Sequence, residues 1–120
     1  MFRNNAALKF KGKYYDLIKN GSKTQTMRIP AKKLKDIKPH DLVIAIFTDR
    51  EEQLLLEITE VGYKQFKSIT DEDAKNEGFN SVAELKHELE EIYTIYTLQD
   101  YDRLYYYKFI VAGEMEVVKE

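Results

Sequence analysis

An unbroken apolar run from Leu42 to Phe47 is the feature that most limits how this chain can fold. Turn-forming residues bound the run, with Pro39-His40-Asp41 before it and Asp49-Arg50 after it. A short apolar run between turn signals is typical of a strand that is buried on both of its faces. We therefore predict a sheet with other elements packed against it.

The remaining elements are predicted from periodicity and from helix start and stop signals. Predicted strands cover residues 7–10, 22–28, 42–47, 53–59, 62–66, 104–112 and 114–118, and a predicted helix covers residues 12–20. Two further helices begin at Thr70 and Ser81, because an acidic residue follows each of them three positions later, as in a capping box. The mixed order predicts an α+β fold, a small β-barrel of about six strands with about three short helices packed outside it.

The chain of 120 residues fits one domain, residues 1–120, and shows no repeat or linker. It has no cysteine, which excludes disulfides and thiolate metal sites, and His40 and His87 are far apart in the sequence. We expect no cofactor and no metal. No apolar segment approaches membrane-spanning length, so the prediction is a cytoplasmic protein without membrane contact, with a monomer favoured.

Charge is unevenly distributed along the chain. Residues 1–40 hold eleven Lys or Arg and two Asp or Glu, a balance of +9, whereas residues 41–120 hold eight and nineteen, a balance of −11. A basic segment attracts polyanions such as nucleic acid. Lysines usually serve only to keep a surface soluble. Nucleic-acid binding is favoured here because the same segment also contains an unusual polar strand.

That polar strand follows Asn20-Gly21, a helix stop signal. Period two places Thr26 and Arg28 on one face. The adjacent Lys23 and these two residues are poor core material, because unpaired buried charge costs several kcal/mol. They therefore face water or a ligand. Arg28 suits phosphate or carboxylate, Lys23 is a base when desolvated, and Thr26 is a hydroxyl that a base can activate.

Residues 21–28, G-S-K-T-Q-T-M-R, match the G-x-K-x-x-T-x-R signature of ASCH domains, which resemble the PUA RNA-binding fold. The preceding residues 14–20 resemble that family's helix before the signature. Residues 38–43, K-P-H-D-L-V, resemble its K-P-G-D-x-V turn, with His40 where glycine is preferred. Residues 74–79, A-K-N-E-G-F, resemble its Glu-Gly-Phe corner, and residues 105–109 resemble its last barrel strand. The resemblance covers nearly the whole chain.

The resemblance implies a PUA-like barrel with a cleft at the signature and a role with RNA or with an RNA-derived nucleoside. One branch of the family hydrolyses the acetyl amide of N4-acetylcytidine with a lysine, a threonine and a glutamate. These roles fall on Lys23, Thr26 and Glu77, which are the predicted catalytic residues. Gly21, Arg28 and Tyr93 are the predicted substrate-binding residues.

Two other functions fit the same residues. In a binding module without catalysis, the basic stretch Lys32, Lys33 and Lys35 would contact the phosphates of single-stranded RNA, and exposed tyrosines would stack on its bases. In a ribonuclease, Lys23 or Glu77 would act as the base near the 2′-hydroxyl. The sequence leaves the choice among these three functions open.

Overall fold

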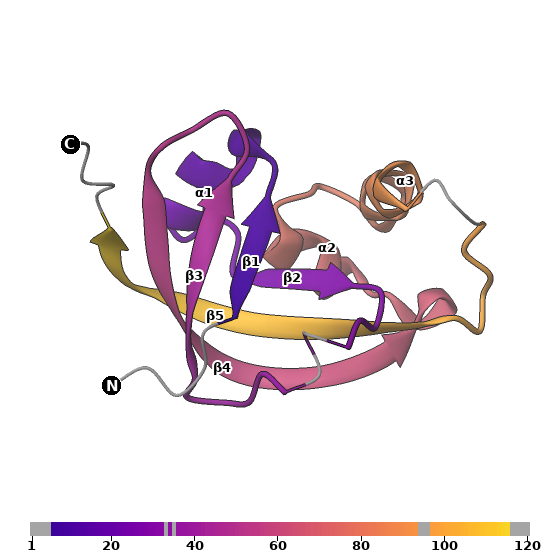
Figure 1. Cartoon of the computed structure of the whole chain (residues 1–120). Helices are drawn as coiled ribbons and strands as arrows, with labels where there is room; N and C mark the ends of the chain where they lie inside the picture. Colours follow the sequence, from indigo (N-terminus) through magenta and orange to yellow (C-terminus); the bar gives the residue numbers. More distant parts are fainter. Residues whose placement is uncertain (1–5, 33, 35, 94–96, 116–120) are drawn as a thin grey trace.

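The structure, a computed structural model, describes residues 6–32, 34, 36–93 and 97–115 of the chain. Within these ranges one mixed sheet has the strand order β1-β3-β4-β5-β2. Its strands are β1 (Ala7–Phe10), β2 (Gln25–Arg28), β3 (Leu42–Phe47), β4 (Gln53–Gln65) and β5 (Arg103–Met115). The pairing of β1 with β3 is parallel and every other pairing is antiparallel. The long strands β4 and β5 run side by side through the molecule (Figure 1).

Helices lie at two places around this sheet. A 3₁₀ turn (Gly12–Tyr14) leads into α1 (Tyr15–Lys19), so the predicted helix 12–20 is present as two short pieces. A second 3₁₀ turn (Phe66–Ser68) precedes α2 (Asp71–Glu77), and α3 (Val82–Ile92) follows. Both predicted helix starts are confirmed. Figure 1 shows α2 and α3 grouped on the side of β2, away from α1. No helix in the described ranges has both the length and the apolar character needed to cross a membrane.

The predicted six-stranded barrel is wrong, because the described residues form an open sheet of five strands. The number of strands is smaller than predicted because breaks were predicted at residues 60–61 and at Gly113. Both places lie inside continuous strands. A register shift between Ile58 and Glu60 bends β4 without ending it. Gly62 serves close packing, because a Cβ there would lie 2.5 Å from the ring of Tyr106.

The turn before β3 explains the glycine preference noted at position 40. His40 has a φ of 76°, in the left-handed region that glycine adopts without steric cost. Its N–H donates to the carbonyl of Ile58 at 2.6 Å, which fixes the turn against β4. The predicted turn at residues 39–41 is therefore present, with a non-glycine residue in a conformation that disfavours side chains.

Two apolar cores hold the elements together. The first lies between α1 and the β1-β3-β4-β5 part of the sheet and includes Phe47 and Tyr107. The second lies under α2 and α3 and includes Met27 and Leu89. Tyr107 of β5 is fully buried in the first core. The boundary between the two cores is the place where polar residues of β2 enter the interior.

The short helix α2 is fixed at both ends. At its start the hydroxyl of Thr70 accepts from the N–H of Asp73 at 3.1 Å, and the Asp73 carboxylate accepts from the N–H of Thr70 at 2.9 Å. At its end Gly78 has a φ of 95°, and its N–H bonds back to the carbonyls of Ala74 and Lys75. These caps determine where Glu77, the last residue of α2, projects.

We expect Thr70→Ala to lower the free energy of unfolding by about 1 kcal/mol, because it removes one half of this capping box. Urea denaturation followed by circular dichroism measures the change. Thr59→Ala, a substitution of the same residue type within β4 and away from any cap, is the control. An unchanged urea midpoint for Thr70→Ala would show that α2 does not depend on its cap.

Candidate active site

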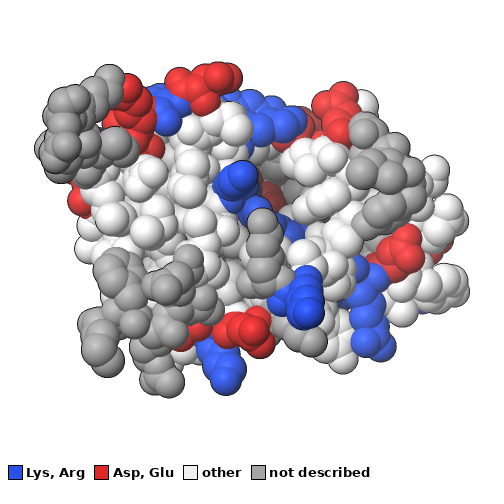
Figure 2. Space-filling view, viewed as in Figure 1, with Lys and Arg blue, Asp and Glu red and all other residues white. Residues whose placement is uncertain are grey.

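A cavity of about 240 Å³ opens where β1 and β2 face α3. Figure 2 shows basic side chains bordering a hollow on this face of the molecule. On the α3 side, Leu85, Leu89 and Ile92 form a mainly apolar wall, and polar side chains from β1, β2 and the end of α2 line the rest. Its lining includes Lys9, Lys11, Tyr14, Lys23, Thr26, Arg28, Glu77, Glu88 and Tyr93.

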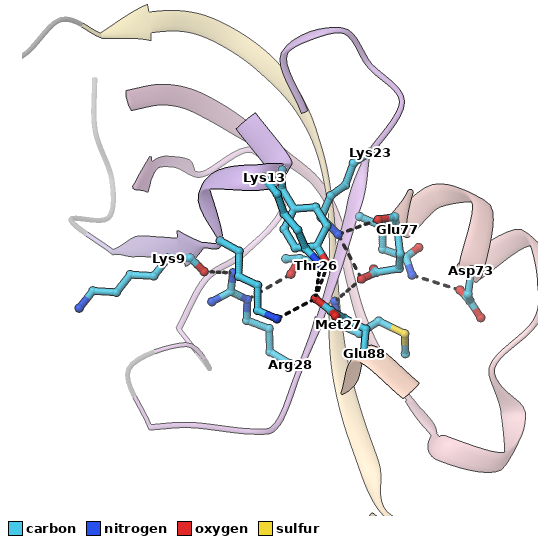
Figure 3. Close-up of polar contacts among 12 residues, drawn as sticks. Lys9, Lys13, Lys23, Thr26, Met27, Arg28, Asp73, Glu77 and Glu88 are labelled. Atoms are coloured by element: carbon cyan, nitrogen blue, oxygen red, sulfur yellow. Dashed lines mark hydrogen bonds and ion pairs between the residues drawn. The ribbon is translucent and has the colours of Figure 1, made fainter. Parts of the chain in front are cut away.

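Lys23 enters the cavity wall directly after the turn that ends α1. Its N–H bonds to the carbonyl of Leu17 at 2.9 Å, and its side chain runs inward, with the whole residue only 3% exposed. Its Nζ donates to the backbone carbonyl of Glu77 at 3.0 Å and lies 3.3 Å from Glu77 Oε1. The same Nζ lies 4.8 Å from the centre of the Tyr14 ring. Lys23 and Glu77 therefore form a buried ion pair across 54 positions of sequence (Figure 3).

Thr26 and Arg28 stand on the same face of β2, as period two predicted. Thr26 is buried, and its Oγ1 accepts from Arg28 Nε at 3.2 Å. The guanidinium is fixed from two further sides, because it donates to the carbonyl of Lys9 at 2.6 Å and lies 4.8 Å from the Phe10 ring. Figure 3 shows Thr26 and Arg28 on the side of the Lys23–Glu77 pair that faces Lys9. A cationic group thus touches the only hydroxyl of the signature that lines this cavity.

Burial shifts both members of the ion pair toward their neutral forms. It lowers the pKa of Lys23, although the Glu77 carboxylate partly offsets this effect. It raises the pKa of Glu77, although Lys23 opposes that shift. Burial also lowers the pKa of Arg28, which stays cationic because its ordinary value is so high. Lys23 is therefore suited to accept a proton at a pH at which an exposed lysine would already hold one.

A second carboxylate, Glu88 of α3, lines the cavity and was not predicted as a site residue. Its Oε2 accepts hydrogen bonds from the Tyr14 hydroxyl and from Lys11 Nζ, the latter at 3.1 Å, and Lys13 Nζ lies 3.4 Å away. Burial raises the pKa of Glu88, but the hydrogen bonds from Tyr14 and Lys11 outweigh it, and the net shift is downward. Glu88 is thus held as an anion and ties α3 to the N-terminal segment.

The other predicted site residues divide between the cavity and the surface. Tyr93 lines the cavity, and its hydroxyl accepts from the N–H of Ile29 at 3.3 Å. Gly21 lies outside this cavity, in the turn after α1, where its φ of 84° suits glycine. Lys32 is exposed and does not line the cavity. Lys33 and Lys35 lie outside the described residues.

Sequence reasoning also missed Gln25 and Asp73. Gln25 is fully buried, and its Nε2 donates to Asp73 Oδ1 at 3.2 Å. Alternation along β2 places Gln25 on the face opposite Thr26, so its polarity in a buried strand was a usable signal. Asp73 resembled a simple helix-capping residue in the sequence. Tyr14 resembled a core residue of a helix, and no pattern connected it with Glu88.

The cavity brings together the kinds of group that an acyl transfer uses. It combines a hydroxyl, a buried amine with a lowered pKa and a fixed guanidinium, and such groups can act as a nucleophile, a base and an anion stabiliser. Within the described ranges, no three His, Asp or Glu side chains converge in a way that could hold a metal ion.

Comparisons with known proteins agree with the resemblance found in the sequence. A family model described as the ASCH domain matches residues 1–119. None of the curated proteins is similar enough in sequence to give a significant match.

Three solved structures share the fold at low sequence identity. The ASCH domain from Lactobacillus crispatus JV V101 has a TM-score of 0.76 and 18% identity, over 93% of this chain and 82% of that one. A protein from Enterococcus faecalis V583 has a TM-score of 0.72 and 16% identity, over 95% and 79% of the two chains. A hypothetical protein has a TM-score of 0.67 and 21% identity, over 88% and 96%. Because the family model spans nearly the whole sequence and these folds agree with it, the chain belongs to the ASCH domain family.

Proposed function

We propose that this protein is an amidohydrolase that removes the acetyl group of N4-acetylcytidine. One observation carries the proposal, namely the buried contact of 3.3 Å between Lys23 Nζ and Glu77 Oε1 in a cavity that Thr26 also lines. A lysine and a glutamate are rarely buried together for stability alone, because desolvating two charges costs more than a single pair usually returns. A catalytic use of the pair accounts for its position.

The first step is the transfer of the acetyl group to Thr26. The neutral amine of Lys23 takes the proton of the Thr26 hydroxyl as the oxygen attacks the acetyl carbonyl carbon. The negative charge that develops on the carbonyl oxygen is stabilised by the guanidinium of Arg28, which already contacts Thr26 Oγ1. The C–N bond then breaks, and Lys23 returns the proton to the departing N4 amine. Cytidine leaves, and an acetyl ester remains on Thr26.

The second step hydrolyses that ester. A water molecule attacks the ester carbonyl, and Lys23 accepts a proton from the water. Collapse of this second intermediate breaks the ester bond, and the proton passes to Thr26 Oγ1. Acetic acid is released and ionises to acetate and a proton that passes to solvent, so one water is consumed for each amide cleaved. Throughout both steps Glu77 holds the amine and stabilises the ammonium form whenever Lys23 carries the proton.

The direct test is incubation of the purified protein with N4-acetylcytidine, with cytidine measured by chromatography and acetate by NMR. We expect both products in equal amounts. N4-methylcytidine is the matched control substrate, because it has the same nucleoside but no amide carbonyl, and it should remain intact. If the protein released neither cytidine nor acetate, the amidohydrolase proposal would be wrong.

The second candidate is a module that binds single-stranded RNA without turnover, and the basic rim of the cavity favours it. Lys9 and Lys11 line the cavity and are exposed, and Lys13 lies beside them. Phosphate contacts to such a rim would leave the cavity to hold one base. A ribonuclease would use the same rim but would cleave the strand, so intact RNA after incubation separates it from a binding module.

For the binding module we expect the affinity for an oligoribonucleotide to fall as salt rises. Each lysine that contacts a phosphate contributes about 0.7 to the slope of log affinity against log salt. The triple variant Lys32→Glu, Lys33→Glu, Lys35→Glu should reduce that slope by about 2, measured by fluorescence anisotropy. Lys75→Glu, on the exposed side of α2, is the control. A slope that the triple variant leaves unchanged would exclude this segment from the RNA contact.

A further inference from the structure

Gln25 occupies a position in β2 that an apolar residue would fill at lower cost. The residue is fully buried, and its Oε1 has no hydrogen-bond partner among the described residues. A buried carbonyl oxygen without a partner costs free energy, whereas an apolar side chain of similar shape leaves no group unpaired. Stability alone therefore does not explain a glutamine at this position.

The other end of the same side chain is tightly held. Gln25 Nε2 donates to Asp73 Oδ1 at 3.2 Å. The second oxygen of Asp73 accepts from Lys64 Nζ at 2.7 Å and from the Thr70 N–H at 2.9 Å. Burial alone would raise the pKa of Asp73, but these hydrogen bonds outweigh it and keep the carboxyl ionised. Because an ionised carboxylate only accepts hydrogen bonds, Asp73 fixes the NH₂ group of Gln25 toward α2.

This orientation brings the amide to the carboxylate of the candidate active site. The Gln25 side chain also stabilises the charged form of Glu77, which lies one turn further along α2 than Asp73. Glu77 Oε1 meets both Lys23 Nζ and the N–H of Met27, each at 3.3 Å, whereas Glu77 Oε2 is buried without a partner among the described residues. The Gln25 amide thus connects the ionised carboxylate of Asp73 to Glu77, the carboxylate that contacts the Lys23 amine.

We propose that Gln25 and Asp73 are positioning residues, which hold the Glu77 carboxylate against Lys23 and so set the pH range in which Lys23 accepts a proton. This inference rests on the hydrolysis proposed above. Neither residue lines the cavity, so neither touches the substrate. Each acts through Glu77.

Other charged groups around the Lys23–Glu77 pair also affect the pKa of Lys23. Lys23 also faces Arg28 of β2, Glu88 of α3 and the ring of Tyr14. Arg28 disfavours the ammonium form, whereas Glu88 favours it. Asp73 faces Lys64 of β4 and the hydroxyl of Thr70. Gln25→Met leaves Arg28, Glu88 and Tyr14 in place, so a change in the Lys23 titration of that variant reports the contribution of the amide.

Gln25→Met removes the amide and keeps a side chain of similar length. Without the amide, the charged form of Glu77 is less stable, so Glu77 stabilises the ammonium form of Lys23 less and the pKa of Lys23 falls. The rise of kcat/KM with pH should therefore move to lower pH, by about 0.5 unit or more. Because Glu77 is also held less precisely, kcat for N4-acetylcytidine should fall by about 10- to 100-fold. Asp73→Asn should move the titration in the same direction and serves as a second variant if Gln25→Met fails to fold.

The decisive measurement is the titration of Lys23 itself, by NMR of protein that carries ¹³C-labelled lysine. Its signal is assigned by its loss in Lys23→Met. Ser81→Ala, which removes the N-cap of α3, is the control for a general loss of stability, and it should lower the melting temperature without moving the titration. An unmoved Lys23 titration in folded Gln25→Met and Asp73→Asn would overturn the inference. The titration needs no turnover, so the two proposals can fail separately. If the variants shift the Lys23 titration but the wild type hydrolyses no N4-acetylcytidine, the proposed reaction is wrong and the inference about Gln25 and Asp73 stands.

Discussion

Lys23→Met is expected to slow the release of cytidine from N4-acetylcytidine by about 10²- to 10⁴-fold, the range that a general base contributes. Methionine keeps the length of the side chain and removes only the amine. The buried carboxylate of Glu77 can respond by taking up a proton, toward which its raised pKa already disposes it, so the fold should persist. The loss should appear in kcat, with KM changed little, because the amine acts on the reacting atoms.

The matched control is Lys19→Met, which removes an exposed lysine of α1 that pairs with Glu114 away from the cavity. It should leave turnover unchanged. Thr26→Val removes the nucleophilic hydroxyl, and the double variant with Lys23→Met should be hardly slower than the worse single variant, because residues that act as one unit are strongly non-additive. Additive losses, or a Lys23→Met variant with normal kcat, would contradict the assigned roles.

The second large effect concerns stability and needs no substrate. Glu77→Leu should lower the free energy of unfolding by about 3 kcal/mol, because buried Lys23 loses its counter-ion and must either keep an unpaired charge or give up its proton, toward which its lowered pKa disposes it. Lys23→Met combined with Glu77→Leu should recover most of that loss, since replacing both partners of a buried pair by apolar groups is often neutral. The two side chains are each only 4% exposed, so solvent screening does not weaken the effect.

Urea denaturation at neutral pH measures both variants. The control is Glu52→Leu, which breaks the exposed pair with Arg50 and should cost no more than about 1 kcal/mol. If the double variant were less stable than Glu77→Leu alone, Lys23 would have a stabilising contact beyond its pairing with Glu77, and the interpretation of the pair as a functional feature would lose its support.

The comparison of sequence and structure shows which signals were sufficient for the fold. The apolar run 42–47 forms β3, and the capping patterns at Thr70 and Ser81 start α2 and α3. The breaks predicted near residues 60–61 and at Gly113 were wrong. Gly62 leaves room for the Tyr106 ring inside β4, and Gly113 lies within β5. Such contacts join residues that are distant in the chain, so a local pattern does not reveal them.

For the site, the signature predicted that Thr26 and Arg28 lie on one strand and that Lys23 lies close to it, and the structure has them on β2 and just before it. Glu77 was predicted from the resemblance of residues 74–79 to the family's Glu-Gly-Phe corner. The structure places all four in one cavity wall. Gln25 and Glu88 were missed for different physical reasons. Gln25 faces away from the cavity, so only its burial marks it, and Glu88 lay in an acidic helix run whose members looked alike until packing buried one of them.

The carbonyl oxygen of Glu77 has a consequence for protein engineering. It belongs to the last residue of α2, and it holds Lys23 Nζ at 3.0 Å independently of the side chain beside it. Because the main chain supplies this acceptor, one of the two contacts of the amine remains when the side chain at position 77 is exchanged. A new side chain at position 77 therefore changes the charge next to the amine, and its cost in stability, while this hydrogen bond to the main chain stays available.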